Sequence, residues 1–326
     1  MMHCLISESN DPYFNLASEE YLLKNSNEDY FLLYINEPCI VAGKHQNLLS
    51  EINLAYVLEN KIKLARRVSG GGTVYQDLNN VNFCFIHNCL NIEKINFEKF
   101  TYPILKALNQ LNLNAKFSER HDILIDDQKI SGNAMHVYRN RILSHGTLLY
   151  RSDLTHLSQA LKNNPTKYTD KSIKSVKSKV TNINTYLKSE LNTLEFCHLI
   201  LDKIELDKPI LEIKKFTLDE TNQIDKLANE KYHSWEWIYG YSPKYNFSNC
   251  IPNGTVPLEF QLSVIKGVIK DVKISSRMID SVLVNKINSL VDVRHDYFSI
   301  YNMLKNQIDN EPLNTMDISE FCNYFF

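Results

Sequence analysis

The residues best suited to chemistry form one run, Leu64–Asn80, which reads LARRVSGGGTVYQDLNN. Three consecutive glycines, Gly70–Gly72, follow Arg67 and Ser69 in this run. Glycine has no Cβ, so its backbone can adopt positive φ and lie flat against a ligand. Successive N–H groups in such a loop form a concave site for anions, and arginine adds a planar fork of donors for phosphate or carboxylate. The run therefore predicts a cradle for a phosphorylated or carboxylated small molecule.

The same loop differs from two well-known nucleotide-binding motifs. No Lys-Ser or Lys-Thr follows the glycines, which excludes a Walker loop. No G-x-G-x-x-G is present and no helix-forming stretch follows, which excludes the dinucleotide fingerprint. A tight hairpin without a ligand stays open as the alternative, and the neighbouring arginines favour a binding site.

A second segment, DDQKISGNA, places Lys129 directly after a predicted turn at Asp126–Gln128. We interpret Lys129 as a cation directed into the cavity that the glycine loop helps to form. The alternative is an exposed lysine on a hairpin. The small residues that follow Lys129 leave room for a ligand near the backbone and favour the first interpretation; they include Ser131, Gly132 and Ala134.

The segment His145–Gly146–Thr147 is a third candidate, because a glycine inside a strand marks a close approach or a bulge. A histidine satisfied at a sheet edge is an equally good interpretation of it. Asp122 is a candidate ligand for Mg²⁺, since this ion commonly uses one or two carboxylates together with phosphate oxygens.

The stretch Lys162–Lys179 carries six lysines against one acid. We expect a loop here. It is either a solvated surface or a segment that closes over a polyphosphate or docks an acidic partner. The aromatic run Trp235–Tyr245 is more typical of a packed connector than of a binding site.

Length and composition limit the classes of protein that fit this chain. Its 326 residues suffice for one large domain and one small domain, and 44% apolar residues exclude global disorder. A net charge of −2 argues against a general nucleic-acid binder. The seven cysteines are scattered, with no C-x-x-C pair, which fits a reducing compartment. Acidic residues interrupt the N-terminus before any long apolar stretch, so we expect a cytoplasmic protein with no membrane-spanning segment.

Hydrophobic periodicity and turn residues predict the elements that must position these groups. Helices are expected from Pro12, over Leu54–Asn60, Phe97–Leu111 and Leu154–Leu161, and from Ser281 and Tyr297. Strands are expected at Tyr30–Ile35, Ile40–Ala42, Lys63–Arg67, Thr73–Tyr75, Val81–His87 and Leu143–Tyr150, with hairpins formed by Asp122–Ile125 and Lys129–Ala134 and by Leu258–Val264 and Val268–Ser275. This mixture favours an α+β fold over a doubly wound one.

Further motifs join these segments in a fixed order along the chain. They are PYFNLASEEYL at Pro12–Leu22, GKHQN at Gly43–Asn47, SVKSKVTNI at Ser175–Ile183 and SWEWIYG at Ser234–Gly240. Together with RRVSGGG, KISGNA and HGTLL, the set resembles the lipoate–protein ligase A family over roughly the first 245 residues. The RRxSGGG element and the K-x-S-G pair are far more specific together than either is alone.

The resemblance implies a fold and an activity. The fold is that of the biotin/lipoate ligases, with mixed sheets and flanking helices over residues 1–246 and a small α+β accessory domain over residues 247–326. The activity is a two-step reaction in which lipoate and ATP, with Mg²⁺, give lipoyl-AMP and pyrophosphate. The lipoyl group then passes to one lysine of an acceptor domain, in 2-oxoacid dehydrogenase complexes or the glycine-cleavage H protein. A monomer without nucleic-acid or membrane partners is expected.

The resemblance also implies roles for individual residues. Lys129 would be the catalytic cation that contacts both the carboxylate and the α-phosphate, and Asp122 with Mg²⁺ would steady the phosphates. The implied substrate- and adenylate-binding residues are Arg67, Ser69, Gly70, Gly71, Gly72, Thr73, Val74, Tyr75, Gln76, Ser131, Gly132, Ala134, His145, Gly146, Thr147, Lys179 and Asn182. Gln76 stands where the family frequently has histidine and Asn79 where it frequently has glycine, so the detailed shape of the loop stays open.

Two other functions remain as alternatives. The first is an octanoyl or lipoyl transferase of the same superfamily, which carries the acyl group on a cysteine and needs no ATP. No cysteine lies between Cys89 and Cys197, so none is near the Lys129 and His145 segments in sequence. The second is a non-catalytic lipoate- or nucleotide-binding module, against which the retained Lys129 and the uninterrupted SGGG argue. Enzymes that catalyse only one half-reaction are also compatible with the sequence.

Overall fold

The computed structural model describes residues 2–89, 97–162, 165–206, 210–252, 256–275, 281–308 and 317–326. The chain divides into two compact units, each assembled from three segments. The first unit comprises Met1–Lys44, Ile62–Gln159 and Ser175–Ser234, and the second comprises His45–Lys61, Ala160–Lys174 and Trp235–Phe326. These units are groups of residues in close contact, and they do not test where the domains divide. The domain boundary expected after residue 246 therefore stays a prediction.

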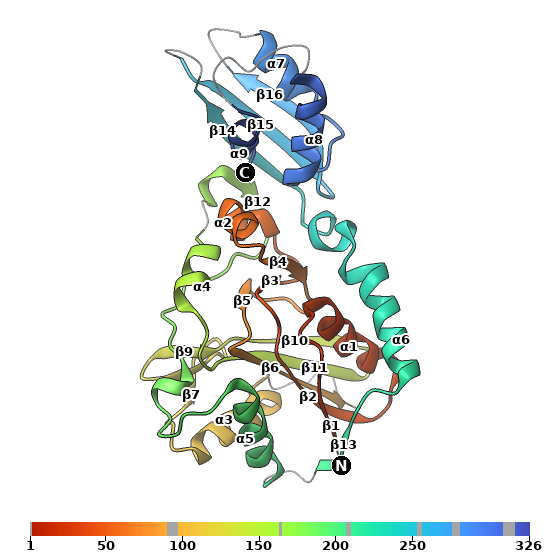
Figure 1. The fold of residues 1–326 in the computed structure, drawn as a ribbon, viewed down its shortest axis with the longest axis vertical. Coiled ribbons are helices and arrows are strands. Elements are labelled where there is room, and N and C mark those ends of the chain that lie inside the picture. Colours follow the sequence, from red (N-terminus) through yellow and green to blue (C-terminus); the bar gives the residue numbers. More distant parts are fainter. Residues whose placement is uncertain are drawn as a thin grey trace. The chain divides into compact units, whose positions relative to one another are not determined.

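A six-stranded mixed sheet forms the centre of the first unit (Figure 1). Its strands, in spatial order, are β10 (Asn133–Tyr138), β11 (Arg141–Leu149), β6 (Asn80–Asn88), β2 (Asp29–Tyr34), β1 (Met2–Ile6) and β13 (Ile210–Lys214). β11 pairs antiparallel with both β10 and β6, and β1 is parallel to both β2 and β13. The expectation of a mixed sheet in an α+β fold is therefore confirmed.

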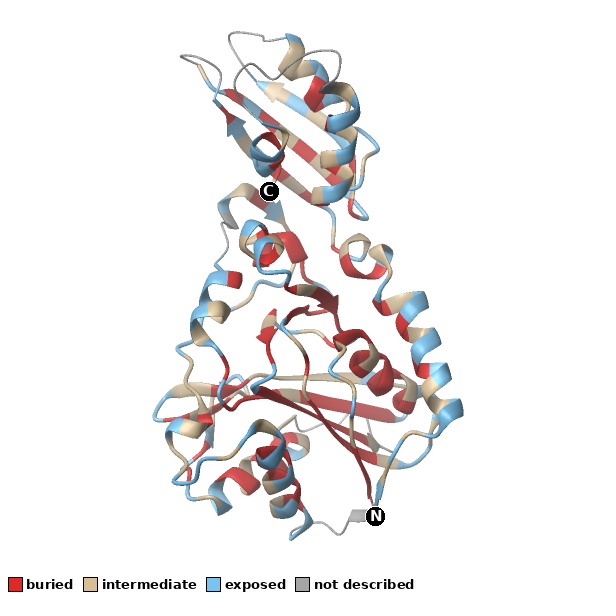
Figure 2. Cartoon of the chain, in the orientation of Figure 1, coloured by how far each residue is buried: buried red, intermediate tan, exposed pale blue. Residues whose placement is uncertain are grey.

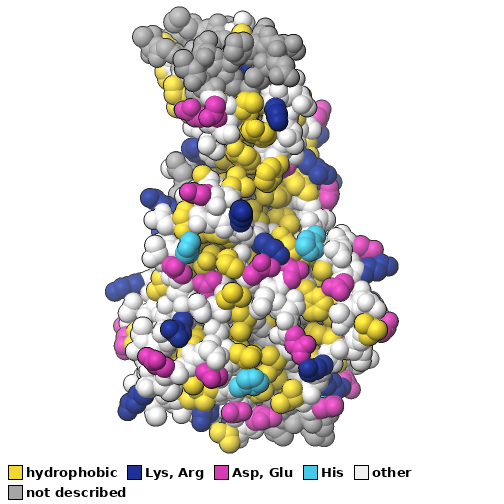
Figure 3. Space-filling model, in the orientation of Figure 1, with side chains coloured by type: hydrophobic (Ala, Val, Ile, Leu, Met, Phe, Trp, Pro, Cys, Tyr) yellow, Lys and Arg dark blue, Asp and Glu magenta, His cyan; other side chains and the backbone are white. Residues whose placement is uncertain are grey.

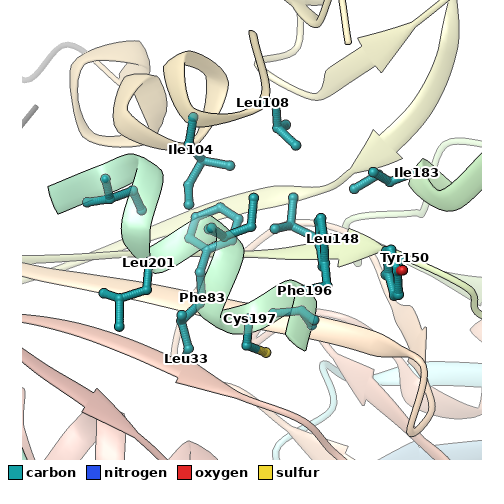
Figure 4. Packing of buried hydrophobic residues seen from close by; sticks show 14 of the residues in the cluster. Leu33, Phe83, Ile104, Leu108, Leu148, Tyr150, Ile183, Phe196, Cys197 and Leu201 are labelled. Atoms are coloured by element: carbon teal, nitrogen blue, oxygen red, sulfur yellow. The ribbon is translucent and has the colours of Figure 1, made fainter. Parts of the chain in front are cut away.

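Helices α3 (Phe97–Gln110) and α5 (Thr193–Glu205) pack together and, with the sheet, bury the main hydrophobic core of this unit (Figure 4). Strand alternation supplies that core: Leu33 of β2 and Phe83 of β6 belong to it. The residues next to them in sequence, Tyr34 and Cys84, are buried outside that cluster. Because side chains alternate along a strand, these neighbours point to the other face of the sheet.

Helix α1 (Pro12–Asn25) contacts β2, β6 and β11 and also α6 (Leu218–Leu227). It begins as the sequence predicts, with the Asp11 side chain capping the N–H of Tyr13 and proline at the first helical position. Its buried residues occur on all sides, because the sheet covers one side and α6, with the π-helical turn Ala228–Tyr232, covers another.

Two small three-stranded sheets position the candidate site segments. One has the order β4-β3-β5, with β4 (Lys63–Arg66), β3 (Cys39–Ala42) and β5 (Val74–Gln76), and the other has the order β7-β8-β9, with β7 (Lys116–Phe117), β8 (Ile123–Ile125) and β9 (Gln128–Ser131). The single strand predicted for Lys129–Ala134 is wrong, since it divides at Gly132 between β9 and β10 of the large sheet. The predicted turn is present, with φ of 48° at Asp126 and 59° at Asp127.

The second unit contains a four-stranded sheet of order β12-β14-β15-β16. Its elements are β12 (Tyr168–Asp170), β14 (Tyr245–Ile251), β15 (Leu258–Ile265), β16 (Val268–Ser275), α2 (Leu54–Glu59), α7 (Ser281–Asn288), α8 (Tyr297–Ile308), α9 (Ile318–Asn323) and the 3-10 turns Leu48–Glu51 and Pro165–Lys167. Buried residues alternate along β15 with exposed or partly exposed ones, so one face of the sheet is covered (Figure 2). The hairpin predicted at Lys266–Gly267 is confirmed.

Two sequence predictions fall in the connecting segments. The Lys162–Lys179 stretch is not a loop throughout, because β12 pairs with β14; residues 163–164 lie outside the described residues. The packed-connector interpretation holds for Trp235, whose indole N–H donates to Asp296 at 2.9 Å. Over the ranges described, no helix combines the length and apolar character needed to cross a membrane.

Candidate functional site

The glycine loop follows β4 and is organised around the guanidinium of Arg67. Nη2 of Arg67 donates to the carbonyls of Gly70 at 2.6 Å and Gly72 at 2.7 Å. Gly71 adopts a φ of 85°, which a side chain would strain. With these carbonyls turned toward Arg67, no hydrogen bond within the described chain uses the N–H groups of Gly70, Gly71 or Gly72. The loop therefore has three donors for an anion.

Arg67 itself is committed to the protein. Nη1 donates to the carbonyl of Val41 at 3.0 Å, and Nε donates to Ser69 Oγ at 3.0 Å. Burial lowers the pKa of Arg67 to about 10, so the guanidinium stays charged at neutral pH. Arg67 thus stabilises the conformation of the glycine loop. Its direct contact with a phosphate or carboxylate stays a prediction.

The end of the lysine-rich stretch lies against the glycine loop. The N–H of Thr73 donates to Ser175 Oγ at 2.9 Å. A Cβ added to Gly72 would lie 3.1 Å from the same oxygen. Ser175 therefore approaches the loop at the position where glycine leaves room for it.

The same stretch then reaches the strand of Lys129. The N–H of Lys129 donates to the carbonyl of Lys179 at 2.8 Å, and the N–H of Thr181 donates to the carbonyl of Lys129 at 3.1 Å. A little further on, Asn182 Nδ2 donates to the carbonyl of Ser152 at 2.9 Å. Residues 175–181 thus connect the glycine loop with Lys129.

The Lys129 ammonium lies 3.0 Å from Asp122 Oδ1, and the two side chains are 24% and 18% exposed. A Cβ on Gly132 would lie 3.1 Å from both Cε and Nζ of Lys129, so the absence of a side chain there makes room for the ammonium. No cluster of three or more His, Cys, Asp or Glu exists among the residues described. Asp122 as a ligand of Mg²⁺ stays a prediction.

Gly146 permits the close approach that its place in a strand predicts. A Cβ at this position would lie 2.6 Å from Cζ of Phe83 and 2.9 Å from the carbonyl of Gly132. The N–H of Thr147 donates to that same carbonyl at 3.1 Å. The KISGNA and HGT segments are thereby held together. The glycine loop reaches them as well, since a Cβ on Gly71 would lie 3.8 Å from Cβ of Ala134.

His145 lies inside the sheet, because β11 has neighbours on both sides, so the sheet-edge interpretation is wrong. Its Nε2 is 2.6 Å from Ser69 Oγ, and its Nδ1 is 2.7 Å from Glu19 Oε2. Tyr34 donates its hydroxyl proton to the other oxygen of Glu19 at 2.9 Å. Sequence reasoning missed Glu19 and Tyr34. The only signal was the pair of acids in LASEEYL, inside an otherwise apolar helix.

Other predicted site residues lie deeper in the unit. Gln76 Oε1 accepts from Asn36 Nδ2 at 2.7 Å, so this amide belongs to a buried polar network. Ser131 is buried and donates to Asn133 Oδ1 at 3.2 Å. Tyr75 is buried and Val74 is partly exposed. Contacts of these residues with a ligand stay predictions.

The structure brings one cysteine to the site that the sequence had separated from it. Cys84 lies directly opposite His145 in the pairing of β6 with β11. It is fully buried, and burial together with the nearby Glu19 carboxylate holds the pKa of its thiol well above the usual range. A thiolate is the nucleophilic form of cysteine, so this environment disfavours acyl transfer through Cys84.

Known proteins are similar to this chain in sequence and in fold. The chain matches the family described as Lipoyl protein ligase A/B catalytic domain over residues 11–205. It is 43% identical to lipoate–protein ligase 1 of Staphylococcus aureus over 306 residues, or 92% of each protein. It is 42% identical to lipoate–protein ligase LplJ of Bacillus subtilis over 269 residues, or 81% of each. The crystal structure of P. falciparum LipL1 in complex with lipoate matches with a TM-score of 0.62 and 28% identity, over 95% of this chain and 97% of that one. These likenesses confirm the biotin/lipoate ligase fold.

Proposed function

Since the chain belongs to the lipoate–protein ligase A family, we propose that it activates lipoate with ATP and transfers the lipoyl group to a lysine of an apo lipoyl-domain protein. The observation that carries this proposal is the meeting of three segments of distant sequence. The glycine loop, the strand of Lys129 and the HGT segment are held against one another by Gly71, Gly132 and Gly146.

The first step joins two anions. An oxygen of the lipoate carboxylate bonds to the α-phosphorus of ATP, and the bond from that phosphorus to the pyrophosphate oxygen breaks. Lys129 offsets the repulsion between the carboxylate and the α-phosphate, and the free N–H groups of the glycine loop bind phosphate oxygens. Magnesium that enters with ATP supplies further charge neutralisation, with Asp122 as its candidate ligand on the protein. Holding both reactants in register supplies much of the rate.

The second step releases AMP. The acceptor amine attacks the acyl carbonyl of lipoyl-AMP, an amide bond forms, the bond to the phosphate oxygen breaks, and the nitrogen loses a proton. Lys129 remains beside the carbonyl and stabilises the negative charge that develops on its oxygen. Residues 175–182, with Lys179 and Asn182, cover the adenylate in this proposal. Neither step needs a nucleophile from the protein.

The acceptors in this proposal are the acyltransferase subunits of 2-oxoacid dehydrogenases and the glycine-cleavage H protein. The ligase acts as a cytoplasmic monomer, and its free cysteines support a reducing compartment. On the face that Figure 3 draws, acidic and basic side chains are interspersed, and this mixture gives no support to a nucleic-acid partner.

The deciding experiment is intact-mass spectrometry of an apo lipoyl domain after incubation with the protein, lipoate, ATP and Mg²⁺. We expect one lipoyl group on the domain, and none when ATP is left out. Equal transfer from an acyl-carrier thioester without ATP would instead identify a transferase. Binding of lipoate without pyrophosphate release or modification of the domain would identify a non-catalytic module.

A further inference from the structure

We propose that Glu19, supported by Tyr34, is a positioning residue for the glycine loop. It acts through His145 and Ser69. The five residues Tyr34, Glu19, His145, Ser69 and Arg67 are called the buried network below. The proposal adds a positioning residue to the proposed function, and its kinetic consequence rests on that function. The proton positions in the network follow from hydrogen-bond chemistry alone.

The two ends of the buried network favour one direction for the hydrogen bonds between them. The Arg67 guanidinium is protonated at neutral pH, so Ser69 Oγ accepts from its Nε–H at 3.0 Å. The single hydroxyl proton of Ser69 then points to the nearest remaining acceptor, His145 Nε2, at 2.6 Å. An Nε2 that accepts a proton leaves the ring proton on Nδ1.

The other end of the network agrees with this assignment. An ionised carboxylate only accepts hydrogen bonds. Glu19 Oε2, at 2.7 Å, is therefore a good acceptor for the Nδ1–H of His145, and Oε1 accepts from Tyr34. The network therefore holds His145 as the Nδ1–H tautomer, in which each hydrogen bond of the network joins one donor to one acceptor.

Burial makes this arrangement rigid. The exposed fractions are 1% for Glu19 and Ser69, and 5% for His145. Bulk solvent therefore has little access to these groups, and a broken hydrogen bond inside would leave an unpaired buried group. A change at Glu19 would therefore alter the hydrogen bond between His145 and Ser69, on the other side of the imidazole.

Ser69 is the residue through which the network reaches the loop. It immediately precedes Gly70, and its own carbonyl accepts from the N–H of Lys44 at 2.8 Å. Its hydroxyl holds Nε of Arg67, whose Nη2 holds the carbonyls of Gly70 and Gly72. The orientation of the loop's free N–H groups thus depends on the imidazole that Glu19 orients.

The neighbouring acid, Glu20, is a matched control. It is 2% exposed and accepts from Tyr232 and Lys231, each at 2.6 Å, and from Lys24 at 2.6 Å. Both acids thus lie on α1, are buried and accept from a tyrosine. Only Glu19 contacts a histidine that reaches the glycine loop.

The first test reads the tautomer directly. The protein is labelled with ¹⁵N-histidine, and the ring nitrogens of His145 are identified among ten histidines by the signals lost in His145→Gln. We expect the Nδ1–H signature in the wild type, and the same in Glu19→Gln, whose amide oxygen can still accept from Nδ1. We expect Glu19→Leu to lose that signature. A wild-type imidazole that is protonated at Nε2, alone or together with Nδ1, would overturn the proton assignment.

The second test separates positioning from stability. In Glu19→Leu we expect kcat/KM for ATP in adenylate formation to fall about 100-fold, mainly through a higher KM, because the phosphate donors are misplaced. Glu19→Gln should recover most of this loss. Glu20→Gln should keep the wild-type KM and the wild-type His145 spectrum even where it lowers the melting temperature. A lower kcat at unchanged KM in Glu19→Leu would indicate a purely structural role and overturn the proposal.

The two tests also cover the cases in which a variant or the proposed function fails. Should Glu19→Leu not fold, the wild-type spectrum decides the tautomer, and Tyr34→Phe replaces it in the kinetic test with the same expected direction and a smaller rise in KM. If the wild type forms no lipoyl-adenylate, the proposed function fails, whereas the imidazole spectrum needs no substrate and still tests the network.

Discussion

The candidate site has two parts that are held in different ways. The buried part consists of Arg67, Ser69, His145 and Glu19, whose side chains are hydrogen-bonded to one another and support the more exposed glycines Gly70–Gly72. The accessible part consists of Lys129, Asp122 and Gly132, where one ion pair on a hairpin joins two partly exposed side chains. The comparison shows that several hydrogen bonds hold the glycine loop, whereas Lys129, the proposed catalytic cation, has one ion pair on a partly exposed hairpin, which we expect phosphates to replace.

The largest expected effect comes from removing that cation. Lys129→Ala should lower both adenylate formation and transfer from preformed lipoyl-AMP by about 1,000-fold, because the charge stabilises the reacting centre in each step. The melting temperature should change little, since the side chain is partly exposed. Lys116→Ala, which removes an exposed lysine from the same small sheet, is the control. Wild-type turnover in Lys129→Ala would show that Lys129 has no catalytic role.

Gly71→Val tests the glycine loop that the buried part supports. A Cβ at Gly71 would lie 3.1 Å from Nη2 of Arg67, and a φ of 85° strains a branched residue by about 1 to 3 kcal/mol. We expect lipoate and ATP to bind roughly 100-fold more weakly by calorimetry. For Gly70→Ala, whose Cβ would meet no atom within 4 Å, we expect unchanged stability. Intact binding in folded Gly71→Val would show that the loop is not the cradle.

Asp122→Asn tests the exchange of partners in the accessible part. The amide keeps the shape of the carboxylate but loses the charge that faces Lys129 and any ion brought by ATP. We expect a loss of about 10-fold in kcat/KM for Mg²⁺-ATP, which corresponds to about 1.4 kcal/mol. Asp127→Asn breaks the exposed pair with Lys116 at 2.7 Å and should change nothing. Equal effects of both substitutions would remove Asp122 from the phosphate site.

The smallest expected effect concerns the cysteines. The Cys84→Ala, Cys89→Ala double variant should keep its lipoylation activity and lose about 1 to 2 kcal/mol of stability, because small cavities form beside β6. Intact-mass analysis of the enzyme with lipoate and ATP should show no thiol-linked acyl group. An adduct that hydroxylamine removes, together with an inactive double variant, would establish a thioester mechanism.

The sequence by itself determined the local features of this protein. The cap at Asp11, the turn at Asp126–Asp127 and the hairpin at Lys266–Gly267 all appear where the residues predicted them. These features depend on backbone preferences and on contacts between residues a few positions apart. The glycine loop and the place of Lys129 after a turn were found for the same reason. The activity was predicted from the family motifs, because backbone preferences carry no information about it.

The tertiary structure alone decided which side chains meet. Glu19 and His145 are 126 residues apart, and Ser69 and His145 are 76 apart. Their contact depends on the register of β11 against β6 and on the packing of α1 over the sheet, neither of which a single sequence specifies. The same register placed Cys84 opposite His145, despite their separation in sequence, and burial then made its thiol a poor nucleophile. Arg67 also has a structural role that depends partly on the fold, because it holds the nearby carbonyls of Gly70 and Gly72 and the distant carbonyl of Val41, 26 residues away. Its predicted contact with a phosphate or carboxylate stays a prediction.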